Sequence, residues 1–358
     1  MTKAANPMTA DGATPTLAAP PPVTPIPAKW VARLLATAAR APSVHNTQPW
    51  RFSVTPHAIE LYADPGRKVH QDAIGRQMLI SCGAALFGLR LAVRELGRVP
   101  AVTLLPDPGR PAVLARVALG PEAPATELER RMLAALPHRH THRGAFDPGP
   151  LPAGLLPSLQ HDALAEGAEL ALIEGPDGYP KLAALVAEAA RKQATNQAAR
   201  EDILRWSRTP GSSHRDGVPA EAFAPAGAAS RARLAQRDFD LDRQIGLLSA
   251  PGPDDPPPAA TAILITAGDL RLDWLRAGQA LHRVLAHAAT AWVFARGPDR
   301  GTDRSGCVRV VGGRVAVRAH RALARAACGL DRNGDAVRRH RAADRKRSRG
   351  RVRTPPPR

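Results

Sequence analysis

The sequence APSVHNTQPWRF at residues 41–52 places four short polar side chains between a predicted helix and a predicted strand. Those side chains belong to Ser43, His45, Asn46 and Gln48. A polar loop held by regular elements on both sides is a common place for ligand binding. Amide side chains offer donors and acceptors together, which suits the edge of a planar heterocycle. The alternative is that Ser43 and Asn46 only cap and turn the chain, a frequent role of both residue types.

Regular elements are predicted on both sides of this loop. Apolar residues at helical spacing predict a helix over 27–40, and Pro42 should end it because proline disfavours helical geometry in the residue before it. Alternating apolar and polar residues at 51–55 and 59–63 predict two short antiparallel strands. The loop is therefore expected to be held at both ends.

A long helix is predicted over residues 71–96, because apolar side chains recur there every three or four positions. Gly97 is a suitable residue to end it. Gly75, Gly83 and Gly88 lie inside this segment, where small residues allow close approach either to another helix or to a ligand. We expect the first of these, tight packing of a central core helix.

Further strands and helices alternate along the rest of the chain. Two apolar runs at 101–105 and 112–119 flank a proline-rich turn and predict a hairpin. Strands are also predicted at 168–173 and 260–266, and helices at 125–136, 179–197, 200–206 and 273–295. The polar segment 207–228 is long for a loop in a compact domain, and such loops are usually functional or mobile. Residues 249–258, rich in Pro and Gly, are interpreted as a linker.

Two of these segments carry a family resemblance. The pattern A-P-S-x-x-N-x-Q-P-W resembles a segment of the FMN-dependent nitroreductase-like family. The stretch from Cys82 to Leu86, CGAAL, resembles the Acg-like subfamily, in which one chain carries two nitroreductase-like halves. The resemblance implies an α+β fold, with an antiparallel-rich sheet surrounded by helices and internally duplicated. The halves are expected at 28–123 and 124–295, after a disordered Pro/Ala-rich segment at 1–27.

The resemblance also implies a cofactor and its contacts. FMN is the expected cofactor, and NAD(P)H is the expected reductant. Ser43, Asn46 and Gln48 are expected to contact the flavin ring, with His45 as a weaker candidate. The loop 207–228 is expected to fold over the cofactor as a lid.

A second polar cluster, HRHTHRGAF, occupies residues 138–146. Arg139, Thr141 and Arg143 alternate along it, so they share one face if the segment is extended. Two guanidinium groups and a hydroxyl on one face suit a monophosphate. The R-x-[ST]-x-R pattern resembles the family's phosphate-binding segment, which implies that this cluster binds the FMN phosphate.

Two other interpretations of this cluster stay open. His138, His140 and His142 also share a face and could bind zinc or nickel, although no Cys, Asp or Glu accompanies them. The segment could also be a solvated basic loop without a ligand.

The composition of the chain changes near residue 296. Residues 296–358 hold 19 of the 50 Lys and Arg but only 5 of the 32 Asp and Glu, so most of the net charge of +18 belongs to this tail. The tail has no Ile, Met, Phe, Trp or Tyr, so it cannot bury a useful core and is expected to be disordered. A genuine basic arm would bind nucleic acid non-specifically. We favour a frameshift near codon 296, because the change falls inside a helix that resembles the family.

Composition also bears on class and compartment. No segment approaches the roughly 20 apolar residues needed to span a bilayer, and residues 1–27 lack the features of a signal sequence. A cytoplasmic protein without membrane contact is therefore expected. Cys82 is expected to be a small core residue, and nothing suggests disulfides or a Cys-based metal site.

The predicted function is an FMN-dependent oxidoreductase of nitroreductase type. Hydride would pass from NAD(P)H through the flavin to a nitroaromatic or quinone acceptor, and no side chain needs to act as nucleophile. The alternatives are an FMN-binding storage or sequestering protein and a nucleic-acid-binding protein acting through the tail. The chain is expected to be a monomeric pseudo-dimer or a homodimer.

Overall fold

The computed structural model describes residues 24–141, 143, 149–225, 237–248 and 260–295, together with the backbone of 308–311. Most of the segment 1–27, the linker 249–258, His142 and most of the tail lie outside the described residues. The expectations for those segments therefore remain sequence-based predictions. The α+β class and the antiparallel-rich sheet are confirmed, as the following elements show.

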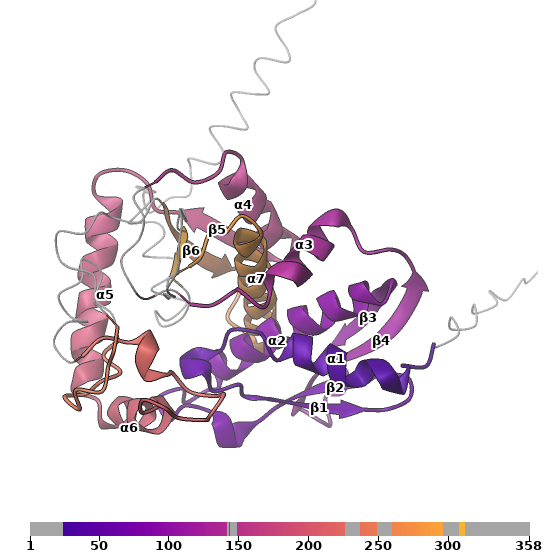
Figure 1. Cartoon of the computed structure of the whole chain (residues 1–358), viewed down its shortest axis with the longest axis horizontal. Coiled ribbons are helices and arrows are strands. Elements are labelled where there is room, and N and C mark those ends of the chain that lie inside the picture. Colours follow the sequence, from indigo (N-terminus) through magenta and orange to yellow (C-terminus); the bar gives the residue numbers. More distant parts are fainter. Residues whose placement is uncertain are drawn as a thin grey trace, which may run out of the picture.

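A four-stranded antiparallel sheet forms the first part of the fold (Figure 1). Its order is β1-β2-β4-β3, where β1 is Trp50–Val54, β2 is Ile59–Ala63, β3 is Arg98–Leu104 and β4 is Val113–Glu122. Both predicted strand pairs are present, and β2 joins them by pairing with β4. The two hairpins thus make one sheet beside the polar loop at 43–49.

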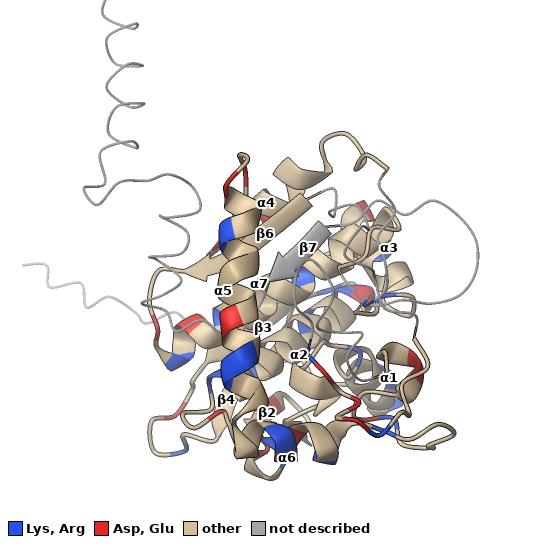
Figure 2. Cartoon of the chain, turned by 90° about the vertical axis from the view of Figure 1, so that its left-hand side faces the viewer, with Lys and Arg blue, Asp and Glu red and all other residues tan. Residues whose placement is uncertain are grey.

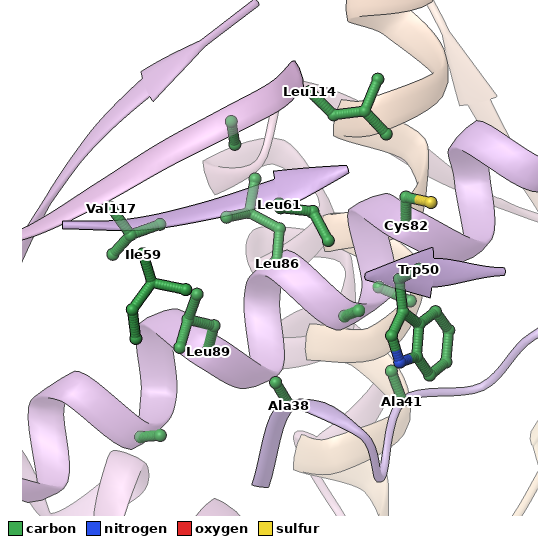
Figure 3. Close-up of a cluster of buried hydrophobic side chains, with 14 of the residues drawn as sticks. Ala38, Ala41, Trp50, Ile59, Leu61, Cys82, Leu86, Leu89, Leu114 and Val117 are labelled. Atoms are coloured by element: carbon green, nitrogen blue, oxygen red, sulfur yellow. The ribbon is translucent and has the colours of Figure 1, made fainter. Parts of the chain in front are cut away.

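Two helices pack with this sheet around the first core. α1 (Ala28–Ala38) ends before Pro42 as predicted, and α2 (Arg76–Glu95) runs through the centre of the molecule (Figure 1). Figure 3 shows Leu61 of the sheet beside Leu86 of α2, and both side chains are fully buried. Cys82 belongs to this cluster, as expected for a small core residue.

α2 begins five residues later than the prediction of 71–96. Gly75 has a φ of 76°, a left-handed conformation that lies before the helix and not within it. The Asp72 carboxylate accepts a hydrogen bond of 2.9 Å from the backbone of Met78 and so closes the first turn. At the other end Gly97 has a φ of 70° and ends the helix as predicted.

The second part of the fold contains more helix than the sequence predicted. Its elements are α3 (Glu127–Ala135), α4 (Leu155–Ala165), β5 (Ala168–Leu172), α5 (Gly178–Ala194), α6 (Gln197–Trp206), β6 (Ala260–Thr266), α7 (Arg271–Thr290) and β7 (Val308–Val311). α4 was not predicted, although Leu155, Leu159 and Ala163 are buried at helical spacing. Its Pro157 lies in the first turn, where a proline is tolerated.

The second sheet has the order β5-β6-β7. β5 and β6 pair antiparallel, whereas β6 and β7 pair parallel. β7 lies within the tail for which the sequence predicted no structure, so these four residues are an exception to that prediction. The rest of the tail lies outside the described residues.

α7 crosses α2 at the centre of the molecule (Figure 1). A Cβ atom on Gly83 would clash with the backbone of Leu275 in α7, and one on Gly278 would clash with the backbone of Ile80 in α2. Each helix therefore supplies a glycine against the backbone of the other, and tight packing is confirmed as the role of Gly83.

α2 is also long and apolar enough to cross a membrane, when length and composition alone are considered. In the folded protein 72% of its apolar window is buried, and the core helix of a soluble domain passes the same test. α2 is therefore weak support for a membrane span. Figure 2 shows acidic and basic residues interspersed along α5, so this helix presents no stripe of one charge.

Candidate functional site

The polar loop at 43–49 forms a tight, strained turn between α1 and β1. Residues Val44–Asn46 make one 3-10 turn, and the Ser43 hydroxyl accepts a hydrogen bond of 3.0 Å from the backbone of Gln48. His45, Asn46 and Gln48 have φ values of 47°, 53° and 50°. Left-handed geometry is uncommon outside glycine, and it persists where surrounding contacts enforce it, often at functional sites. Ser43 thus has the turn-forming role that was one of the two alternatives.

α2 holds this loop in place. The Ser81 hydroxyl accepts a hydrogen bond of 3.2 Å from the backbone of Val44, and the Cys82 thiol donates one of 3.2 Å to the carbonyl of Pro49. Burial raises the pKa of the Cys82 thiol, so it stays protonated and unreactive. The two sequence motifs that suggested the family therefore bind each other directly.

The side-chain amides of the loop contact the segment 207–217. Asn46 Nδ2 donates to the carbonyls of Arg215 at 3.2 Å and Gly217 at 2.9 Å. Gln48 Nε2 donates to the same Arg215 carbonyl at 2.9 Å. Both amides retain their side-chain oxygens as acceptors for a ligand.

Asp216 fastens this segment to the first half of the chain. Its carboxylate accepts hydrogen bonds from Arg67 at 2.9 Å and from Arg208 at 2.8 Å, and Arg67 also donates to the carbonyl of Thr47. Burial alone would raise the pKa of Asp216, but these two guanidinium groups outweigh it and lower the pKa. The polar loop at 207–228 was noticed in the sequence, whereas its pairing with Arg67 was not, because 149 residues separate the partners.

His45 is buried and faces a second segment of the far half. Its Nε2 contacts the guanidinium of Arg237, and its ring meets Phe239 edge-on with centroids 5.4 Å apart. The Arg143 guanidinium lies 5.2 Å from the centroid of the same Phe239 ring. Phe239 therefore links Arg143 of the R-x-T-x-R cluster to His45 of the 43–49 loop. Local sequence patterns gave no reason to select this phenylalanine.

The two arginines of the R-x-T-x-R cluster are half-buried, and the partial removal of their guanidinium groups from water lowers the pKa of each to about 10. Arg139 Nη2 donates to the carbonyl of Arg40 at 3.2 Å. Its Nε and Nη1 atoms are inaccessible and have no hydrogen-bond partner among the described residues. A buried charge without a compensating partner is costly, so these atoms fit an anionic ligand. Thr141 is exposed, and its convergence with the two arginines on a phosphate stays a prediction.

The histidines of the cluster contact aromatic rings that follow α7. The His138 ring lies 5.4 Å from that of Trp292, and the His140 ring stacks on Phe294 at 4.8 Å. These contacts give both imidazoles an aromatic neighbour. The third member of the metal-site interpretation, His142, lies outside the described residues.

A groove of about 1000 Å³ lies elsewhere, between α2, α3, β3 and α7. None of the seven predicted site residues lines it. Three of its wall arginines are paired with acids: Arg90 and Arg283 with Glu166, and Arg94 with Glu129.

Comparisons with known proteins bear on the family of the chain. The nitroreductase family model matches residues 23–78, which include α1, the polar loop and the first two strands. A Mycobacterium tuberculosis protein with the provisional name NAD(P)H nitroreductase is 34% identical over 269 residues, which cover 73% of this chain and 73% of the relative.

Two further relatives come from the same organism. One, provisionally named NAD(P)H nitroreductase Acg, is 28% identical over 255 residues, which cover 71% of this chain and 75% of the relative. The other, named as uncharacterized, is 32% identical over 262 residues, which cover 71% of this chain and 73% of the relative. By its matched motifs and its overall similarity, this chain belongs to the nitroreductase family.

Proposed function

We propose that the protein is an FMN-dependent oxidoreductase that takes hydride from NAD(P)H and passes it to a nitroaromatic or quinone acceptor. Membership of the nitroreductase family supports oxidoreductase chemistry of this general type. The single observation that carries the proposal for FMN is that two donor atoms of the half-buried Arg139 are inaccessible to water and have no partner among the described residues. A phosphate group would supply the missing charge and the missing acceptors.

The other predicted contacts would act on the ring. FMN, when bound, supplies the redox chemistry, and the chain binds and orients it. The side-chain oxygens of Asn46 and Gln48 would accept hydrogen bonds from the ring edge, while Arg139 and Arg143 would bind the phosphate. The segment 207–217, held by Asp216, would limit access of water to the ring. No side chain of the chain is assigned a nucleophilic role.

The visible spectrum of the purified protein tests this proposal. We expect flavin absorbance in the wild type, and loss of most of it in Asn46→Ala and Arg139→Ala. Arg130→Ala is the matched control, because Arg130 pairs with Glu127 on the surface of α3 and touches no predicted site residue. A colourless wild-type protein that does not quench the fluorescence of added FMN would refute the assignment of FMN as the cofactor.

A second function, storage or sequestration of FMN, is favoured by the contacts of the 207–217 segment. Both loop amides already donate to its carbonyls, and Asp216 is held from two sides. A closed cover of this kind would hinder access of a nicotinamide. Reduction of the bound flavin by NADPH, followed by stopped flow and compared with reduction by dithionite, distinguishes the two functions.

We also propose that the chain is internally duplicated, with halves at 28–123 and 124–295, and acts in the cytoplasm as a monomeric pseudo-dimer or a homodimer. The reciprocal packing of Gly83 and Gly278 supports the duplication, because a two-fold axis between α2 and α7 relates such a pair of contacts. Sedimentation of the purified protein determines which oligomeric state it adopts.

A further inference from the structure

His282 of α7 is a fully buried histidine that none of the predicted contacts uses. Its Nδ1 lies 2.7 Å from the carbonyl oxygen of Ala84, and its ring meets that of Phe87 edge-on at 5.4 Å. A carbonyl only accepts, so Nδ1 carries the proton and Nε2 of the neutral ring is a lone-pair acceptor. Nε2 is buried and has no hydrogen-bond partner among the described residues.

Arg139 and His282 lie near the same part of α2. Arg139 reaches the carbonyl of Arg40 just beyond the end of α1, and α1 packs through Ala38 against Gly88 of α2. His282 contacts the same turn of α2, at Ala84 and Phe87. Leu136 and Met132 at the end of α3, just before Arg139, lie in one cluster with Phe87.

The charges around His282 agree with this placement. Burial, together with the positive charge of Arg139, lowers the pKa of His282 to about 3. α2 presents only a carbonyl and an aromatic ring to the imidazole. The neighbouring Arg283 of α7 is paired with Asp162 and Glu166. Among the described residues, Arg139 is therefore the charged group that lowers the pKa of His282.

The unpartnered atoms of the pair are chemically complementary. Arg139 offers two donor nitrogens, Nε and Nη1, which suit an anion, whereas His282 offers an acceptor, which repels a fully ionised anion. An anion that carries a proton satisfies both. A phosphate group, whose second pKa is about 6, has such a proton available near neutral pH. Sulfate and carboxylate do not.

We propose that Arg139 and His282 form a buried phosphate site in which Arg139 binds the phosphate oxygens and His282 Nε2 accepts a hydrogen bond from the phosphate hydroxyl. The proton stays on the phosphate, so no bond is made or broken. His282 thereby makes the site selective for phosphate over sulfate. The inference deepens the proposed function, since the phosphate of FMN is one source of this group and inorganic phosphate is another.

Equilibrium binding of inorganic phosphate and sulfate to the full chain without flavin tests the proposal. Binding is followed by calorimetry at pH 7 and constant ionic strength. We expect the wild type to bind phosphate at least about tenfold more tightly than sulfate, the effect of one hydrogen bond to a charged group. We expect His282→Phe to lose this preference, and Arg139→Met to lose binding of both anions.

Two controls test whether altered packing or loss of the fold explains the result. Phe87→Leu changes the packing beside His282 without removing a polar atom, and it should keep the preference for phosphate. Thermal unfolding of each variant shows whether it is folded. If His282→Phe does not fold, His282→Gln keeps an acceptor oxygen and should retain part of the preference. An unchanged preference in His282→Phe, or equal affinity of the wild type for both anions, overturns the proposal.

FMN and riboflavin separate this inference from the proposed function. Preferential binding of FMN over riboflavin that falls in His282→Phe supports both. Phosphate selectivity that depends on His282, in a protein that binds no flavin, supports the anion site and refutes the flavin assignment. Tight FMN binding that is insensitive to His282→Phe supports the flavin assignment and refutes the role of His282. Absence of anion binding by the wild type also refutes the site.

Discussion

Asn46 and Gly217 exchange two hydrogen bonds although 171 residues separate them in the sequence. The Asn46 side chain donates to the Gly217 carbonyl at 2.9 Å, and the Gly217 backbone donates to the Asn46 carbonyl at 3.0 Å. The 43–49 loop and the 207–217 segment are thus joined by a reciprocal pair of hydrogen bonds, like two neighbouring strands. Access to the candidate site therefore depends on how firmly this segment is held.

Replacing Asp216 by Asn should loosen the 207–217 segment. The change removes the charge that Arg67 and Arg208 share, and we expect it to cost about 1–2 kcal/mol, or a five- to thirtyfold increase in opening. Limited proteolysis under native conditions measures this opening as the cleavage rate within the segment. Glu221→Gln, an exposed acid of the same region, should leave the rate unchanged. Equal rates in both variants would show that the carboxylate does not hold the segment.

Replacing Gly278 by Ala should destabilise the protein, although alanine is the better helix former by about 1 kcal/mol. The added Cβ would press on the backbone of Ile80, and overpacking of this kind costs about 1–3 kcal/mol or more. Gly83→Ala should behave similarly against Leu275. Gly88→Ala is the graded control, because its Cβ would lie 3.1 Å from Ala38 Cα, a tight contact but not a severe one. Urea unfolding midpoints give the order, and stabilisation by Gly278→Ala would contradict it.

Glu60 should make stability depend on pH in the acid range. Hydrogen bonds from Tyr62, Arg116 and Arg110 lower the pKa of Glu60 to about 2. A carboxyl group with a lowered pKa stabilises the fold fully above its unfolded pKa near 4.5, and this stabilisation is lost as the pH falls towards 2.

Unfolding of Glu60→Gln across this range measures the effect. We expect the variant to be less stable than the wild type at pH 7 by about 1–3 kcal/mol, with a difference that shrinks between pH 4.5 and pH 2. Glu127→Gln is the control, since Glu127 is exposed on α3 and should show neither effect. A difference that stays constant with pH would show that the charge of Glu60 is unimportant.

Deletion of residues 312–358 should abolish any binding of nucleic acid and leave flavin binding unchanged. The deleted segment carries many arginines but no aromatic side chains for base stacking, so its binding should be non-specific and should weaken steeply with salt. Gel shifts at several salt concentrations, with flavin fluorescence in parallel, make the comparison. DNA binding that survives the deletion would show that the nucleic-acid-binding site lies in the rest of the chain.

The frameshift hypothesis makes a separate prediction about the gene. Shifting the reading frame once near codon 296 should restore a nitroreductase-like ending with a further helix and a final strand. Re-sequencing of the DNA checks this directly. An uninterrupted gene whose tail keeps its frame would count against the hypothesis.

Local patterns in the sequence predicted most regular elements, because each pattern reports burial on one face. α1, both hairpins and α3 were predicted at nearly their observed positions. The start of α2 was wrong because the left-handed conformation of Gly75 leaves no mark on apolar spacing.

The candidate site was harder to predict, since its contacts join distant segments. Sequence motifs singled out His45 and Arg139, but not Asp216, Arg237 or His282. Asp216 pairs with Arg67, Arg237 contacts His45, and the pKa of His282 responds to the charge of Arg139. Charge and polarity along the chain do not encode which buried atoms lack partners. Thr141, which the same alternation along the chain singled out, is exposed, and its contact with a phosphate stays a prediction.

The left-handed geometry of residues 45, 46 and 48 has a kinetic consequence. Because contacts with α2 and the 207–217 segment enforce this backbone, its shape is set during folding and before any ligand arrives. Once the 207–217 segment opens, a ligand would meet a preformed edge, and little entropy would be lost in ordering it. β-Branched side chains would be excluded from these three positions by the left-handed backbone. Natural variation there should be confined to residues that tolerate this geometry, chiefly Asn, Asp, His and Gly.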